Sequence, residues 1–111
     1  MSLEIKYIDA IPGSRKRGIH QFEDVPDDDS IALPDATAGF GWVMAGDNEV
    51  WMMFAWKKDG TPSIIMASDL SDVDTSDTDG DLCLIDGGTQ VSIKNRLGGA
   101  KDIQMIISCM R

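Results

Sequence analysis

Short apolar runs separated by turn residues dominate the chain from residue 39 onward. They are GFGWVMAG, EVWMMFAW, TPSIIMAS, DLCLID, TQVSIKNR and KDIQMIISC. Each run is six to nine residues long, and the breaks between runs carry Gly, Asn or Asp. This rhythm is typical of consecutive antiparallel strands. It predicts an all-β fold over residues 39–111, an antiparallel sandwich or small barrel of about six to eight strands.

The run EVWMMFAW differs from the others because both of its faces are apolar. Side chains alternate across a strand, so Met52, Phe54 and Trp56 share one face. Trp51 and Met53 share the other. A strand that is apolar on both faces predicts a central position, covered on both sides.

Glycine-containing breaks predict two hairpins. One turn is Lys58-Asp59-Gly60, where glycine tolerates the positive φ of a tight turn, and the other is at Gly87-Gly88. The one helical candidate is a single turn in ASDLSDV, which Ser68 or Asp69 would cap.

The first 38 residues follow another pattern. LEIKYI has the alternation of a strand, but three of the four prolines and several acidic runs follow it before residue 39. Such a composition is typical of irregular, extended chain. We therefore expect two parts: an N-terminal strand and extended arm over residues 1–38, and the β domain over residues 39–111.

The charge is negative overall and unevenly distributed. The net charge is −9, which argues against nucleic acid and anionic membranes as partners because both are negatively charged. Residues 23–86 hold sixteen acidic and two basic side chains, whereas residues 1–22 carry +2 and residues 87–111 carry +3. In a homo-oligomer the basic arm of one copy would meet the acidic face of another. The simpler interpretation is a surface that happens to be unevenly charged.

Targeting signals are not evident. The start MSLEIKYIDAIPG lacks a basic segment followed by an apolar run, so we expect no secretory signal. The longest apolar run, VWMMFAW, is too short to span a bilayer, which needs about twenty residues.

The stretch DVDTSDTDGDLCLIDGG is the nearest approach to a binding motif. With Gly80 in sixth place of a calcium loop, Asp77, Asp79 and Asp81 fall at ligand positions. The first ligand position, however, is the neutral Thr75, and no helix is predicted on either side. We expect a solvated turn before the LCLI strand, with calcium binding as the alternative and no other cofactor.

Catalytic motifs are missing from the sequence. His20 is the only histidine, and no HExxH, CxxC, Walker, GxGxxG or GxSxG pattern occurs. Cys83 and Cys109 lie in apolar runs, as reduced core thiols do. We therefore expect no enzymatic activity.

The aromatic residues leave two interpretations open. Trp42, Trp51, Phe54 and Trp56 lie in strand-like runs, where aromatic side chains usually belong to the core. The alternative is that they line a groove for a ligand.

The C-terminal run LCLIDGGTQVSIKNRLGGAKDIQMIIS resembles the closing strands of small accessory structural proteins of tailed bacteriophages. In those proteins an I-x-N-R-x-G turn follows a glycine hairpin and leads into the last strand. Here its residues are Ile93, Asn95, Arg96 and Gly98. The resemblance implies a compact β domain with an extended arm that sits on a capsid as a decoration protein, or in a head fibre or tail, commonly as a trimer. It implies no active site.

We therefore expect a non-enzymatic virion structural protein, most specifically a capsid decoration protein that is assembled in the host cytoplasm. Its partners would be the major capsid protein or other virion proteins, and copies of itself, for example in a trimer. The arm would dock on a neighbouring subunit through basic and apolar residues: Arg15, Lys16, Arg17, Ile19, Phe22, Ile31 and Leu33. The alternatives are a head-fibre or tail component and a small β module that binds carbohydrate or peptide on its tryptophan-bearing surface.

Overall fold

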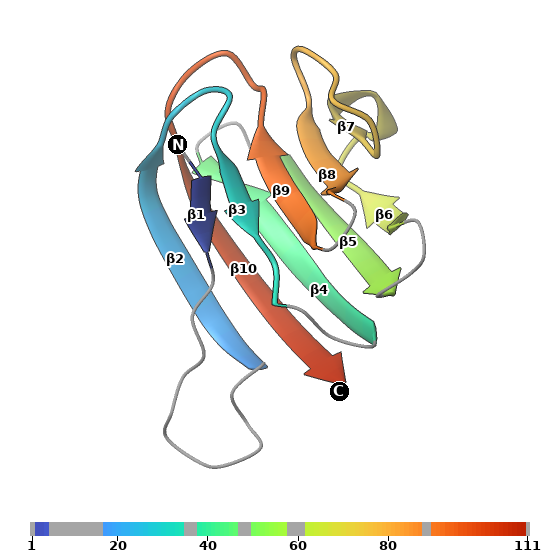
Figure 1. Cartoon of the computed structure of the whole chain (residues 1–111). Coiled ribbons are helices and arrows are strands. Elements are labelled where there is room, and N and C mark those ends of the chain that lie inside the picture. Colours follow the sequence, from blue (N-terminus) through green and yellow to red (C-terminus); the bar gives the residue numbers. More distant parts are fainter. Residues whose placement is uncertain are drawn as a thin grey trace.

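Two five-stranded sheets face each other across one hydrophobic core (Figure 1). A computed structural model describes residues 2–4, 17–34, 38–46, 50–57, 62–87 and 90–110. The prediction of an all-β fold is confirmed, and of the two predicted forms the protein takes the sandwich. The described part of the chain holds ten strands. Seven of them, β4 to β10, lie in the region for which six to eight were predicted, and the residues before it form three more.

The strand order alternates between segments that are distant in the sequence. The β9 sheet has the order β1 (Ser2–Glu4), β3 (Ser30–Ala32), β9 (Val91–Asn95), β8 (Leu82–Asp86) and β7 (Val73–Asp74). The β4 sheet has the order β2 (Arg17–Val25), β10 (Lys101–Met110), β4 (Ala38–Ala45), β5 (Val50–Lys57) and β6 (Ser63–Ala67). Neighbouring strands are antiparallel except in the pairs β1–β3 and β7–β8, which are parallel.

The predicted division into an arm over residues 1–38 and a domain over residues 39–111 is wrong for residues 17–34. Strand β2 pairs with β10 along Arg17–Val25 and forms one edge of the β4 sheet. Strand β3 pairs with β9, and Leu33 continues the ladder by donating its N–H to the carbonyl oxygen of Val91 at 2.8 Å. The polar composition that suggested an arm has another cause: an edge strand and the crossing between two sheets both face water.

The core is built from the inward side chains of both sheets. In β5, every second residue from Val50 to Trp56 is buried, which confirms the predicted alternation of this strand. Phe54 and Trp56 stack with ring centroids 5.7 Å apart. The β9 sheet contributes aliphatic residues such as Leu84 and Ile93, which have no exposed surface.

Several predicted turns are confirmed. Strands β8 and β9 form a hairpin in which the N–H of Gly87 donates to the carbonyl oxygen of Gln90 at 2.9 Å. The single helical turn is a 3-10 turn, η2 (Leu70–Asp72), and Asp69 caps it by accepting from the N–H of Ser71 at 2.9 Å. Strands β5 and β6 pair as predicted, but the turn Lys58-Asp59-Gly60 lies outside the described residues. Within the described ranges, no helix is long and apolar enough to span a membrane.

Candidate functional site: the outer face of the β4 sheet

A row of apolar side chains crosses the outer face of the β4 sheet from edge to edge. The strand register places one such residue on each of the five strands, in the order Ile19, Ile106, Trp42, Met53 and Met66. Each keeps between 40% and 60% of its surface exposed, whereas inward residues of the three central strands, such as Val43, Met52 and Met105, are buried. We call these five residues the apolar row.

Further apolar side chains widen the row. Phe40 and Met44 lie on β4 two residues to either side of Trp42 and are also exposed. Trp51 meets the edge of Trp42 in a T-shaped contact, with ring centroids 6.1 Å apart and an interplanar angle of 87°. Single exposed apolar residues are normal on a protein surface, whereas contiguous exposed apolar groups are typical of interaction sites, so this face is the candidate site.

This face corrects the prediction that β5 is covered on both sides. Its Met52 side is buried, but Met53 on the other side is 42% exposed. The apolar character of this face is visible in the sequence, because EVWMMFAW and GFGWVMAG are both apolar at their outward positions. A strand pattern alone does not distinguish a face covered by the same chain from a face left for a partner.

The outer face of the β9 sheet has the opposite character. On β9, Ser92 and Lys94 alternate with the buried Val91, Ile93 and Asn95. This alternation is the ordinary pattern of an antiparallel sheet with one face in water. The apolar outer face is therefore a property of the β4 sheet and not of the sandwich as a whole.

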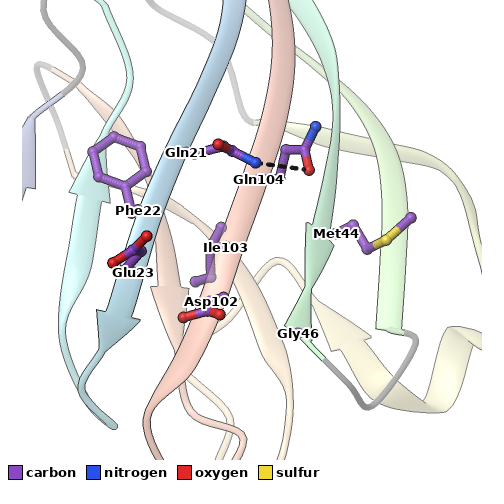
Figure 2. Close-up of a pocket in the computed structure, with 8 residues that line it drawn as sticks. All are labelled: Gln21, Phe22, Glu23, Met44, Gly46, Asp102, Ile103 and Gln104. Carbon is purple, nitrogen blue, oxygen red and sulfur yellow. Dashed lines mark hydrogen bonds between the residues drawn. The ribbon is translucent and has the colours of Figure 1, made fainter.

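Charged residues lie at the two ends of the apolar face. At the end where β10 begins, Glu23 and Asp102 are exposed beside a pocket of about 280 Å³ (Figure 2). At this pocket, the side-chain amide of Gln21 donates a hydrogen bond of 3.4 Å to the side-chain oxygen of Gln104. At the opposite end, where β5 terminates, Lys57 is exposed.

The structure divides the four aromatic residues between the two interpretations. Phe54 and Trp56 belong to the core, with 0% and 3% of their surface exposed. Trp42 and Trp51 belong to the outer face, where Trp42 is part of the apolar row and Trp51 lies beside it. A shallow groove of about 80 Å³ runs beside Trp42, with Ile106 in its wall.

The predicted docking residues are dispersed. Ile31 and Leu33 have no exposed surface, so the expectation that they fill pockets of a neighbour is wrong: the β3 segment uses them for its own core. Phe22 is partly buried against that core, and Ile19 is 60% exposed in the apolar row. Residues 15–16 lie outside the described residues, and Arg17 occupies the first position of β2.

The acidic stretch forms the turn that was predicted before β8. Its carboxylates contact protein donors: Asp74 accepts from the hydroxyl of Thr78 at 2.9 Å, and Asp77 contacts Lys94 and Arg96, each at 2.8 Å. Over the described part of the chain, no group of three or more His, Cys, Asp or Glu residues is arranged to hold a metal ion.

Two residues with catalytic potential lie in unreactive surroundings. His20 faces the interior of the sandwich opposite Met105, its Nε2 atom is buried without a hydrogen-bond partner, and burial lowers its pKa. Burial raises the pKa of the Cys83 thiol, which favours the unreactive protonated form. The two predicted core thiols lie in different sheets, where Cys83 is buried and Cys109 is partly buried.

Comparison with protein-family models, with curated proteins and with solved structures finds no match to this chain.

Proposed function

We propose that the protein is a non-enzymatic structural protein that works by associating with other protein surfaces through the outer face of the β4 sheet. The observation that carries this proposal is the apolar row, in which each of five adjacent strands presents an exposed apolar side chain. Covering the exposed half of one such side chain contributes about 1 kcal/mol. A partner that covers the whole row gains several times this amount.

The setting that we propose is the particle of a tailed bacteriophage, with the protein as a capsid decoration protein that stabilises the shell. Support for this setting comes from the resemblance of the C-terminal run, which includes Asn95 and Arg96. The major capsid protein is then the proposed partner. In the docking mechanism, the segment Arg15–Arg17 and the exposed Ile19 remain as proposed contacts.

A particle-binding assay tests this function. Purified protein is mixed with particles that lack it, the particles are sedimented, and the bound copies are counted by quantitative mass spectrometry. We expect copy numbers comparable with the major capsid protein for the wild type and at least tenfold fewer for Ile106→Lys, which places a charge in the apolar row. Leu70→Lys is the control, because Leu70 is 72% exposed but lies in η2, outside the β4 sheet.

The outcomes of this assay separate the settings. A few copies per particle would indicate a fibre, collar or tail component. No binding of the wild type to particles would overturn the virion setting. Equal binding of wild type and Ile106→Lys would show that the apolar row is not the attachment surface.

A second candidate function is a binding module for carbohydrate or peptide. The observation in its favour is the exposed contact between Trp42 and Trp51 beside the shallow groove, because aromatic side chains often bind such ligands. Titration with soluble oligosaccharides and short peptides tests it through tryptophan fluorescence. A saturable spectral change that is lost in Trp42→Ala would favour the module over the structural protein.

A further inference from the structure

We infer that the partner of the apolar row is a second copy of this chain. The two copies pack face to face through their β4 sheets, with strands running in opposite directions and the two-fold axis along the row. This inference rests on the proposed function only in taking the face as an association surface. It makes a second copy, in place of the major capsid protein, the partner of the row, so that the dimer would bind the capsid through other residues such as the segment Arg15–Arg17. Ile106→Lys would then weaken attachment because a monomer docks at one site and a dimer at two.

Uncharged side chains flank the row on both sides. On one side, the register aligns Ser108, Phe40 and Ala55 on β10, β4 and β5. On the other side, it aligns Gln104, Met44 and Trp51 on the same strands. None of these six side chains is charged, and each side contributes aromatic or long apolar groups.

A two-fold axis along the row therefore places Phe40 near Met44 of the partner and Ala55 near its Trp51, while the polar Ser108 lies near the polar Gln104. Each residue of the row then lies near its own counterpart, which is the self-complementary arrangement of an isologous dimer. Each flanking set lies against the other set. The Phe40 set of one copy thus faces the Met44 set of its partner.

Charge selects the direction of packing. Glu23 and Asp102 are exposed at one end of the face, whereas Lys57 is exposed at the other. Packing with strands in opposite directions brings the acidic end of one copy toward the basic end of the other. Packing with strands in the same direction would place the acidic ends together, where like charges repel.

The size of the face is sufficient for a dimer. Five strands spaced about 4.8 Å apart, with an average length of eight residues and a rise of about 3.3 Å per residue, cover a projected area of roughly 500 Å². Side chains that project from the sheet add to this area. The accessible area therefore reaches the low end of the roughly 600–1,000 Å² that each partner contributes to a stable interface. Two sheets pack face to face in this way when their strand directions cross at about 30°.

Met53 provides a direct test, because this geometry places it near the Met53 of the partner. Sedimentation velocity on the full chain, over about 1–300 µM, measures the oligomeric state. We expect a wild-type dimer, and at least tenfold weaker association for Met53→Glu and for Met53→Lys because each brings like charges together. A mixture of the two variants is expected to form mixed dimers. Leu70→Glu is the control and is expected to dimerise like the wild type.

Pairing specificity distinguishes the two packing directions. If the strands of the two copies ran in the same direction, β5 would lie over β10 of the partner. The Met53→Glu variant would then form mixed dimers with Ile106→Lys and not with Met53→Lys. That result would overturn the inferred geometry. Circular dichroism confirms that each variant is folded, and Ile106→Glu with Ile106→Lys forms a second matched pair if the Met53 variants lose structure.

Other results overturn the inference as a whole. They are a wild type that remains monomeric at the highest concentration, a trimer, or a Met53→Glu variant that dimerises like the wild type. The particle-binding assay shows whether such a result contradicts only the dimer or also the proposed function. A monomer that binds particles would overturn the dimer alone, and a dimer that does not bind them would overturn the virion setting alone.

Discussion

Arg96 and Asp77 join two segments of the β9 sheet through a contact of 2.8 Å between guanidinium Nη1 and carboxylate Oδ1. Lys94 Nζ lies 2.8 Å from the other oxygen of Asp77, and Arg96 Nε lies 2.9 Å from Asp28. The end of β9 thus supplies the cations for two acidic loops. This arrangement accounts for part of the uneven charge along the chain: an acidic middle folds against a basic C-terminal third.

Replacing Asp77 with Asn is expected to lower the thermal unfolding midpoint at pH 7. The hydrogen bond from Lys94, followed by that from Arg96, holds the pKa of Asp77 below its usual range in the folded protein. A carboxyl group with a lowered folded-state pKa stabilises the fold above its unfolded pKa, about 3.9, and this contribution is lost as the pH falls through the folded value.

Differential scanning calorimetry between pH 7 and pH 2.5 checks this prediction. The difference in unfolding midpoint between wild type and Asp77→Asn is expected to decrease below about pH 4. Asp79→Asn is the control and is expected to have a smaller effect, because Asp79 is 84% exposed and lies 3.4 Å from Arg96. A difference in unfolding midpoint that stays constant down to pH 2.5 would show that the ionised form of Asp77 is not what stabilises the fold.

Asn95 is expected to be the most sensitive polar residue of the fold. It has no exposed surface, and its amide nitrogen lies 2.9 Å from the carbonyl oxygens of both Val25 and Gly99. Its side-chain oxygen accepts from the N–H of Leu97 at 3.0 Å. Asn95→Leu leaves these buried groups without partners and is expected to reduce the free energy of unfolding by about 2–4 kcal/mol.

Urea denaturation measures this loss. Lys94→Leu, a substitution at the neighbouring and partly exposed position, is the matched control and is expected to cost less than about 1 kcal/mol. Equal losses in the two variants would show that the buried hydrogen bonds of Asn95 are not the source of its effect.

Gly41 is expected to tolerate no side chain. A Cβ atom at this position would lie 2.6 Å from the carbonyl oxygen of Ile106 and 2.8 Å from Cγ2 of Ile107. The first of these atoms belongs to the backbone of the paired strand and cannot move aside without disturbing the ladder. Gly41→Ala is expected to destabilise the protein by about 1–3 kcal/mol.

Chemical denaturation of Gly41→Ala and of Gly99→Ala checks this prediction. At Gly99, no atom lies within 4 Å of the added Cβ, so the second variant is expected to remain close to the wild type. A Gly41→Ala protein as stable as the wild type would show that β4 and β10 can separate enough to admit a methyl group.

Tryptophan fluorescence is expected to distinguish the two aromatic environments. A variant that retains only Trp56 is expected to emit at shorter wavelength and to resist quenching by acrylamide, because this ring is 3% exposed and stacks on Phe54. A variant that retains only Trp42, which is 40% exposed, is expected to be quenched readily at concentrations where the chain is monomeric. Similar quenching of both variants would contradict the assignment of Trp42 to the outer face.

Much of the fold could be predicted from the order of residues alone. The alternation in VSIKN fixes which residues of β9 face the core, and Asp69 marks the start of the 3-10 turn η2. These features depend on local geometry: a strand has a period of two, and a carboxylate can accept a backbone N–H two residues away. Local geometry is encoded within a few residues, so a single sequence is enough to predict it.

The arrangement of the N-terminal third could not be predicted in this way. The sequence from Arg17 to Leu33 is polar and contains proline, which is equally compatible with an arm and with edge strands. Its role is decided by pairing with β10 and β9, which lie about 60 to 90 residues away in the chain. No local pattern determines such a pairing, because it depends on which strand edges remain open.

The sequence by itself determined the all-β class, the alternation of strands such as β5 and β9, and the capped turn at Asp69. Only the tertiary structure decided that Ile31 is buried while Met53 is exposed, although both are apolar residues in strands. Burial depends on what lies above each face of a sheet, and this is set by the stacking of the two sheets. The apolar row likewise exists only through the register that aligns Ile19, Trp42 and Met66 across strands distant in the chain.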